Sequence, residues 1–234
     1  MIPISDNLRT YKRPIVNSWL IGINVLIFFW EIQLEIGGKL GNFIYTWGLV
    51  PRQFTTDLTN AIFVNPAAWV VVLGRLSSLL LALFLHGSFS QILGNMLFLW
   101  VFGKSLENHL GHRQYLLFYL ITGVLTGLGQ ILVEPNLTVP LIGANGAIAA
   151  ILGAYVIKFP KAQIDSILPL IIIYIPLQLP AYFYLLWWFI QQLCNSIGSL
   201  NIPPSGVNQA GLAYWMQVVG MIMGVAYMRW KCDR

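Results

Sequence analysis

Neutral amide side chains stand inside the apolar stretches of this chain, where they could do chemistry or hold helices together. Asn145 lies in a cradle of small residues, between Gly143 and Gly146, in the stretch LIGANGAIAAILGAY. Gln217 lies in GLAYWMQVVGMIMGV, three residues before Gly220. Polar residues within membrane spans are costly and are therefore functional candidates. An amide donates and accepts hydrogen bonds, but near neutral pH it is neither a nucleophile nor a base.

The stretch LHGSFSQILGNM holds three more polar side chains, His86, Gln91 and Asn95. Gln91 and Asn95 are four positions apart and share one face of a helix, whereas His86 need not share that face. For any single amide, the simpler interpretation is a hydrogen bond between neighbouring helices, worth ~0.6–2 kcal/mol. Three amides converging on one cavity would be less ordinary, although amides alone perform no obvious chemistry.

Gly220 and Gly224 form a small-xxx-small pattern, which lets two helices pack closely. Gln217 lies on the same helix face, three and seven positions before these glycines. The stretch around Asn145 offers a matching face of small residues that begins at Gly146. We therefore expect the two faces to pack together and to bring Asn145 close to Gln217, provided that the helix ends are level.

The composition places these residues in a membrane. Of the 234 residues, 57% are hydrophobic and 9% are charged, whereas a soluble domain carries roughly 25% charged residues. The length suits one domain of several membrane helices, with the lipid bilayer as its partner. The net charge of +5 requires no nucleic acid, because the basic residues cluster beside apolar segments. The two cysteines, Cys194 and Cys232, indicate no disulfide framework, and no cofactor is implied.

The lengths of the apolar runs predict an all-α membrane protein with a bundle of six transmembrane helices. These spans cover residues 17–36, 88–107, 113–133, 143–158, 180–198 and 208–228. Residues 1–16 are polar and basic, show no cleavable signal, and form a cytoplasmic N-terminal segment before a membrane domain at 17–228. Residues 229–234 form a cytoplasmic C-terminal tail.

Two other apolar runs are ambiguous. The run at 169–180 is short and contains Pro176, so we expect an interfacial connector there. Residues 61–85 contain Pro66 and Arg75, and we expect a membrane-embedded loop and a short helix that lead into the second span.

The basic residues predict the orientation of the spans. Of the 13 lysines and arginines, ten fall in segments expected inside and three in segments expected outside, as the positive-inside rule requires. Six spans then place both termini in the cytoplasm. A plasma or inner membrane is the default location, because no organelle address is visible.

The fourth span is too short to cross the bilayer. Its ~16 residues make ~24 Å of helix, against ~30 Å of hydrocarbon. Lys158 and Lys161 fix its cytoplasmic end, so its N-terminus lies inside the membrane. Asn145 then occupies a first helical turn whose free N–H groups need protein partners or a water-filled cavity. The sequence thus predicts a pocket open to the outside, with Asn145 on its floor.

Three motifs together resemble the rhomboid family of intramembrane serine proteases. LFLHGSFSQILGNMLFLW, LIGANGAIAAILGAY and GLAYWMQVVGMIMG occur in the family's order, and the resemblance runs from about residue 17 to 228. The family pattern has His-x4-His-x3-Asn in the second span, Gly-x-Ser-Gly in the fourth, and Ala-His-x2-Gly-x3-Gly in the sixth. The resemblance implies six helices around a water-accessible cavity, with a serine that starts a short fourth helix.

This chain keeps the frame of those motifs and departs from them at the chemistry. Asn145 stands at the nucleophile position, and Gln217 stands at the base position. His86 and Asn95 match the second-span pattern, but Gln91 replaces its second histidine, so the implied oxyanion site is degenerate. The glycines expected to serve helix packing all match: Gly143, Gly146, Gly220 and Gly224.

The leading hypothesis is a catalytically inactive rhomboid-like protein that binds transmembrane segments of client proteins without cutting them. An activated nucleophile needs a hydroxyl or thiol and a base, and the matching positions supply neither. The rival is an active rhomboid-type serine endopeptidase that uses non-standard residues, such as Ser88 or Ser90 with His86, or a partner subunit.

Two further functions have less support in the sequence. A channel or transporter would show an inverted repeat or a chain of ionisable residues through the spans, and we detect neither. His109 and His112 with Glu107 lack the spacing of a zinc protease, so we expect no metal and assign the two histidines to the membrane interface.

Overall fold

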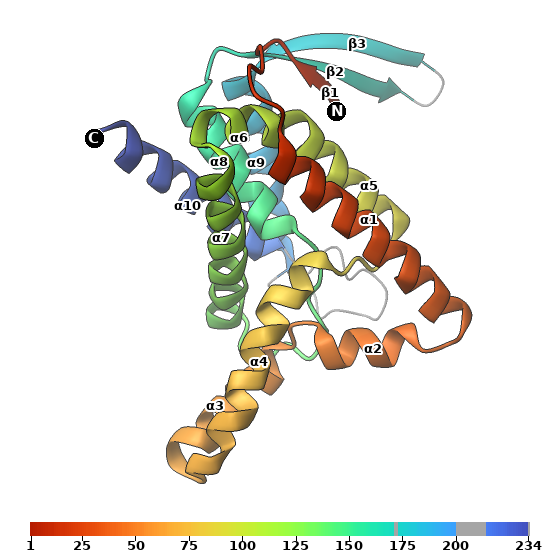
Figure 1. Ribbon diagram of the computed structural model, residues 1–234, viewed down its shortest axis with the longest axis vertical. Helices are drawn as coiled ribbons and strands as arrows, with labels where there is room; N and C mark the ends of the chain where they lie inside the picture. The colour runs from red at the N-terminus through yellow and green to blue at the C-terminus, as the bar shows by residue number, and fades with distance from the viewer. Residues whose placement is uncertain (171–172, 200–213, 234) are drawn as a thin grey trace.

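The computed structural model describes residues 1–170, 173–199 and 214–233 and is dominated by helices (Figure 1). The α-helices are α1 (Ile15–Ile36), α2 (Leu40–Trp47), α3 (Pro51–Phe63), α4 (Trp69–Leu81), α5 (Phe89–Phe98), α6 (Lys104–Leu110), α7 (His112–Val133), α8 (Asn145–Lys158), α9 (Ala181–Ser199) and α10 (Tyr214–Cys232). Two 3₁₀ turns, η1 (Pro66–Ala68) and η2 (Ala82–Phe84), flank α4, and a π-helical segment, η3 (Leu99–Gly103), joins α5 to α6.

The expectation of a helical membrane bundle is confirmed. Helices occupy the positions of all six predicted spans, with the α5–η3–α6 stretch as the second. Within the described residues, three helical stretches are long and apolar enough to cross a membrane: Ile15–Ile36, Pro66–Phe84 and His112–Val133. The helix at the fourth position, Asn145–Lys158, is apolar and shorter.

Helix α8 lies at the centre of the bundle. Every residue from 145 to 155 is buried, and α8 packs against α7, α10 and η3. A helix that is apolar on all faces is typical of such a central position. Residues 145 to 155 are thus enclosed by protein, which is what the start of a helix needs if it lies inside a membrane.

Residues 61–85 differ from the expected loop and short helix. Residues 61–63 end α3, and Pro66–Phe84 forms one helical stretch that is itself a candidate span. Pro66 begins this stretch rather than breaking it, because proline fits the first helical position, where no N–H partner exists. The side chain of Asn65 caps the same end by accepting from the backbone N–H of Ala67 at 3.0 Å.

The charge within that stretch is also compensated. Arg75 on α4 donates to Asp57 on α3 at 2.8 Å, and both side chains are about three-quarters buried. The ion pair joins α3 and α4 into a helical hairpin that extends beyond the bundle at the end away from the termini (Figure 1). An isolated arginine argued against a helix here, but a partner on the neighbouring helix removes that objection.

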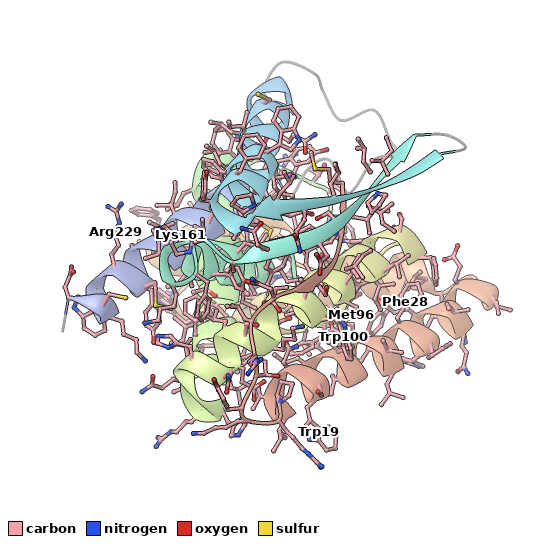
Figure 2. The ribbon with its side chains drawn as sticks, turned by 90° about the horizontal axis from the view of Figure 1, so that it is seen from above. Trp19, Phe28, Met96, Trp100, Lys161 and Arg229 are labelled. Atoms are coloured by element: carbon pink, nitrogen blue, oxygen red, sulfur yellow. The ribbon has the colours of Figure 1, made fainter. Side chains whose placement is uncertain are left out.

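A small antiparallel sheet, which we had not expected, lies at the end of the bundle that carries the chain termini (Figures 1 and 2). Its strands are β1 (Ile2–Asp6), β2 (Gln163–Leu170) and β3 (Ile173–Pro180), in the order β1-β2-β3. The run 169–180, expected to be an interfacial connector and not a span, is thus mostly strand in its described residues. Pairing with β2 supplies hydrogen bonds to a backbone that an apolar connector would leave unsatisfied.

The sheet is fixed to the helices through Asp6, whose side chain is buried. Its Oδ2 accepts from Ser105 Oγ at 2.6 Å and from Tyr155 OH at 2.8 Å. Its Oδ1 lies 3.2 Å from Lys104 Nζ. A carboxylate at the end of β1 therefore binds α6 and α8 together, so the N-terminal segment is part of the folded domain.

The second helical stretch runs to Leu110, beyond the expected end at 107, and contains the π segment. In a π segment a backbone carbonyl loses its usual helical partner. Here the carbonyl of Leu99 accepts from Asn17 Nδ2 of α1 at 2.9 Å, and Asn17 Oδ1 accepts from Tyr115 OH at 2.7 Å. The irregularity thus anchors α1 and α7 to the second stretch.

Helix α10 also runs further than the sixth predicted span. Residues 208–213 lie outside the described part of the chain, and the helix continues to Cys232, so most of the expected tail at 229–234 is helical. Arg229 and Lys231 lie in its last turn, where positive side chains interact favourably with the helix dipole.

Candidate functional site

The loop before α8 brings Asn145 to the start of that helix. Gly143 has φ +106°, a conformation that favours glycine, and its N–H donates to the carbonyl of Ala82 at 2.8 Å. A Cβ added at Gly143 would lie 2.4 Å from Gln91 Nε2. We expected Gly143 to serve helix packing, but it lies in the turn before α8, where backbone shape and the side chain of Gln91 require glycine.

Gln91 ties this loop to the start of α5. Its Oε1 accepts from the N–H of Gly87 at 2.9 Å, and its Nε2 donates to the carbonyl of Ile142 at 2.9 Å. Ser88 caps α5 by accepting from the backbone N–H of Gln91. The oxygen and the nitrogen of the Gln91 amide therefore join the loop before α5 to the loop before α8.

The small-residue faces of α8 and α10 meet directly. An added Cβ at Gly220 would lie 2.2 Å from the carbonyl oxygen of Gly146, and one at Gly224 would lie 1.9 Å from that of Ala150. Gly146 also faces α7, since its added Cβ would lie 2.0 Å from Thr126 Oγ1. Backbone therefore touches backbone between α8 and α10.

That contact sets Asn145 and Gln217 at the same depth. Asn145 precedes Gly146 directly, and Gln217 lies one helical turn before Gly220. Both line a cavity of about 360 Å³ together with Gln91 and Asn95 of α5. The remaining lining residues are Ser90, Gly94, Phe98, Ile148, Trp188, Gln192 and Tyr214.

The lining of this cavity is polar and almost free of ionisable groups. Tyr214 is the one titratable side chain among the described lining residues, which include no histidine, lysine, cysteine or carboxylate. The Oε1 atom of Gln217 is buried and has no hydrogen-bond partner within the described part of the chain. The cavity therefore offers donors and acceptors, including an unsatisfied carbonyl, but no strong base.

His86 lies behind the cavity and not in its lining. Its Nε2 is 3.1 Å from Asn95 Nδ2, and its Nδ1 is 3.3 Å from the carbonyl oxygen of Phe84. An amide nitrogen donates and a carbonyl accepts, so the proton of a neutral imidazole belongs on Nδ1. His86 thus orients Asn95 from behind, and of the three polar candidates His86, Gln91 and Asn95 only Gln91 and Asn95 line the cavity.

Sequence reasoning missed Glu31, which supports His86 in turn. The Glu31 carboxylate of α1 is buried and accepts from the backbone N–H of His86, with both oxygens at 3.1 Å. The available signal was an ionisable residue inside an apolar span, because such residues are functional candidates by default.

Gln130 on α7 was also missed. Its Oε1 accepts from the backbone N–H of Met216 at 3.1 Å, and its Nε2 donates to Glu134 at 2.6 Å. Free N–H groups in the first turn of a helix need partners. Gln130 supplies one for α10 and so fixes the turn that carries Gln217.

The alternative serine pairs are not assembled. Ser88 Oγ lies 3.2 Å from Ser90 Oγ, while His86 contacts Asn95 and Phe84 instead of either serine. The histidine and glutamate at the other end of the bundle do not form a metal site. His112 Nδ1 is 2.5 Å from Glu107, but the described residues contain no group of three or more side chains able to hold a metal ion.

A family model, the Rhomboid domain, matches residues 73–234 of this chain. The chain belongs to the rhomboid family. The match covers the cavity, both small-residue faces and all the helices from α5 onward. Helices α1 to α3 precede it.

Named relatives agree with this membership. The human presenilin-associated rhomboid-like protein, mitochondrial, is 34% identical over 165 residues, which are 69% of this chain and 37% of that protein. Rhomboid protein 1, mitochondrial, of Saccharomyces cerevisiae is 26% identical over 70% of this chain and 42% of its own length. The putative rhomboid protease YdcA of Bacillus subtilis is 34% identical over 33% of this chain and 38% of its own length. This rhomboid chain thus spans about two fifths of the relatives it matches.

Proposed function

We propose that this rhomboid holds transmembrane segments of client proteins in its polar cavity without cutting them. The observation that carries the proposal is the chemistry of the cavity lining. Asn145 and Gln217 stand where rhomboid chemistry requires a hydroxyl and a base, and Gln91 and Asn95 complete a lining of neutral amides. Acyl transfer needs an activated nucleophile, and an amide pair cannot provide one.

Amides suit a binding role inside a membrane. They donate and accept hydrogen bonds without a pH-dependent charge, and interhelical bonds of this kind are worth ~0.6–2 kcal/mol. The unpartnered Oε1 of Gln217 would accept from a polar side chain or a free N–H group of a client helix. A segment with a polar residue or a helix break gains most from such a cavity, because lipid offers it no partner.

A comparison of reactivities tests the absence of proteolysis. The purified protein is treated with a fluorophosphonate probe, and cleavage of a generic transmembrane substrate is followed in parallel. The parent should neither react with the probe nor cut the substrate, whereas the double variant Asn145→Ser with Gln217→His should react with the probe. Gln91→His is added only in a second variant, because Gln91 also holds the loop at Ile142.

Crosslinking tests client binding itself. Gly94 lines the cavity, and a Cβ added there meets nothing within 4 Å, so Gly94→Cys introduces a reactive group without a clash. Gly74 on α4 is equally open and outside the cavity lining, so Gly74→Cys is the matched control. A model transmembrane helix with one central asparagine should crosslink to the first variant and not to the second. Equal crosslinking of both, or none from Gly94→Cys, contradicts the proposal.

The rival function is a serine endopeptidase. In its favour, a Bacillus subtilis relative is named a putative rhomboid protease, and Ser90 offers a hydroxyl to the cavity. If the protein has this function, the fluorophosphonate probe should label the parent protein, and Ser90→Ala should abolish the labelling.

The orientation in the membrane is a further part of the proposal. Both termini would face the cytoplasm, with residues 1–16 and the end of the chain on the inner side of a plasma or inner membrane. Cys232 is exposed near the C-terminus. In a Cys194→Ser variant, which removes the other exposed thiol, a membrane-impermeant maleimide should label Cys232 only after the membrane is permeabilised. Labelling of this variant in intact cells would indicate the opposite orientation.

A further inference from the structure

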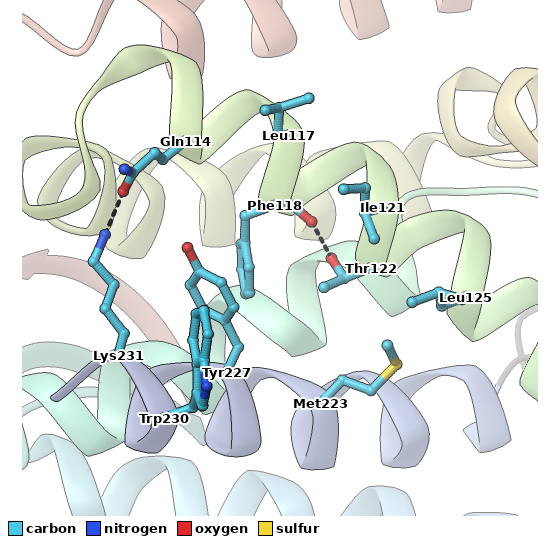
Figure 3. Close-up of a pocket in the computed structure, with 10 residues that line it drawn as sticks. All are labelled: Gln114, Leu117, Phe118, Ile121, Thr122, Leu125, Met223, Tyr227, Trp230 and Lys231. Carbon is cyan, nitrogen blue, oxygen red and sulfur yellow. Dashed lines mark hydrogen bonds between the residues drawn. The ribbon is translucent and has the colours of Figure 1, made fainter. Parts of the chain in front are cut away.

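A groove separate from the amide cavity runs between α7 and α10. It encloses about 510 Å³, and Figure 3 shows its side chains projecting from the two helices. One wall is formed by Leu117, Ile121 and Leu125 of α7, and Met223 faces them from α10. Leu117 is 48% exposed and Ile121 is 54% exposed, so the groove opens outward from the bundle, where lipid surrounds a membrane protein.

One end of the groove is aromatic, and the hydroxyl of Thr122 beside it is already hydrogen-bonded. Phe118 and Tyr227 pack with ring centroids 4.8 Å apart, and Trp230 follows at 6.4 Å from Tyr227. Thr122 Oγ1 donates to the carbonyl of Phe118 at 2.7 Å. Apart from the Tyr227 hydroxyl, the groove beyond its mouth therefore presents mainly apolar surface, and its aromatic end is of the kind found at membrane interfaces.

The polar mouth of the groove carries a positive charge. Lys231 Nζ donates to Gln114 Oε1 across the opening (Figure 3). The ion pairs in the described part of the chain involve other basic side chains, so Lys231 has a neutral partner there. Other basic side chains lie at this end of the bundle, since Lys158 is in the last turn of α8 and Arg229 is in the last turn of α10 with Lys231.

The dimensions match one leaflet of a bilayer. From Gln114 to Leu125, α7 rises ~16 Å at ~1.5 Å per residue. Half of the ~30 Å hydrocarbon core is ~15 Å. A groove with its charge at the membrane surface and its apolar wall reaching to the bilayer centre has the length of a single acyl chain.

We propose that this groove binds one anionic phospholipid, with its phosphate at Lys231 and an acyl chain along Leu117, Ile121 and Leu125. An ammonium held by a neutral amide keeps its charge for a phosphate, and basic pockets between membrane helices favour anionic head groups. A client helix or a second copy of the chain would fill the apolar wall but would leave this charge without a counterpart.

Lipid binding is measured by native mass spectrometry of the delipidated protein, with phosphatidylglycerol and phosphatidylcholine of identical acyl chains. The parent should bind phosphatidylglycerol about fivefold more tightly, since one lysine near the surface contributes that much. Lys231→Gln should remove the preference. The matched control Lys12→Gln, an exposed lysine outside the groove, should keep it.

The apolar wall is tested with a second pair of variants. Ile121→Trp fills the groove and should weaken the binding of both lipids at least fivefold. Leu132→Trp is the control, at an 84% exposed position on the same helix outside the groove, and it should leave the binding of both lipids unchanged. Equal affinities of the two lipids for the parent, the same loss in Lys12→Gln, or indifference to Ile121→Trp would each overturn the proposal. So would a dimer peak that disappears in Ile121→Trp, since it would assign the groove to a second copy.

Discussion

The amide nitrogen of Asn95 lies 3.1 Å from Nε2 of His86, and the backbone N–H of His86 is held by the carboxylate of Glu31. Three polar residues from α1, the loop before α5, and α5 thus form a continuous chain of contacts that ends at the cavity. The same cavity receives Asn145 and Gln217 from two other helices. These polar groups therefore form one supported site around the cavity.

Breaking the contact between Asn95 and His86 should destabilise the protein. His86→Leu leaves the Asn95 donor and the Phe84 carbonyl without this partner inside the membrane, and we expect a loss of about 1–2 kcal/mol. Thermal unfolding in detergent measures it. His109→Leu, at the helix end away from the cavity, should change stability by less than about 0.5 kcal/mol. Equal losses in the two variants would contradict a specific role for the contact.

The contact between α8 and α10 should not tolerate even one methyl group. Gly220→Ala places a Cβ 2.2 Å from the carbonyl oxygen of Gly146, and we expect a loss of about 1–3 kcal/mol because two backbones must move apart. Gly22→Ala in α1 is the control, since an added Cβ meets nothing within 4 Å there. It should be neutral or stabilising by up to ~1 kcal/mol. Similar unfolding temperatures for the two variants would show that the helices are not in close contact.

Glu107 caps a helix that is far away in sequence. Its carboxylate accepts from the backbone N–H groups of Val16 at 2.9 Å and Asn17 at 2.7 Å, in the first turn of α1. Glu107→Ala should therefore cost about 1–3 kcal/mol and increase hydrogen exchange at the start of α1. Glu35→Ala, at the exposed end of the same helix, should leave both quantities unchanged. Unaltered exchange at Val16 and Asn17 in Glu107→Ala would be the contrary result.

Asn145→Ser by itself should not restore reactivity with a fluorophosphonate. A serine hydroxyl is weakly nucleophilic without a base, and the described lining of the cavity contains none. The combination with Gln217→His supplies that base at the same depth, so labelling should require both changes. Equal labelling of the single and double variants would mean that another group activates the hydroxyl.

The helical bundle and the short α8 could be predicted because their signals are local. Apolar run length, the two lysines after the fourth run and the small residues at helical spacing all act within one segment. The same applies to the amide positions, which the motif order singled out. Local patterns can also indicate a contact between helices, since the small-residue spacing in α8 and in α10 was enough to predict that Gly146 and Gly220 belong to packing faces.

Other features depended on partners distant in sequence. Arg75 argued against a long helix until Asp57 on α3 was placed beside it. The apolar run at 169–180 could be identified as strand only through its pairing with β2, which in turn pairs with the N-terminal strand. When two distant segments pair through their backbones, the pairing leaves no periodic pattern in the sequence of either segment.

The sequence by itself determined that this is a membrane bundle of the rhomboid type, and its motifs singled out Asn145 and Gln217 as the positions to examine. Only the tertiary structure decided what surrounds them. It gave Gln91 to the loop at Ile142, placed His86 behind Asn95, and opened a charged groove at Lys231. The reason is physical: residue types limit the chemistry a side chain can do, whereas its hydrogen-bond partners and exposure depend on which distant segments fold against it.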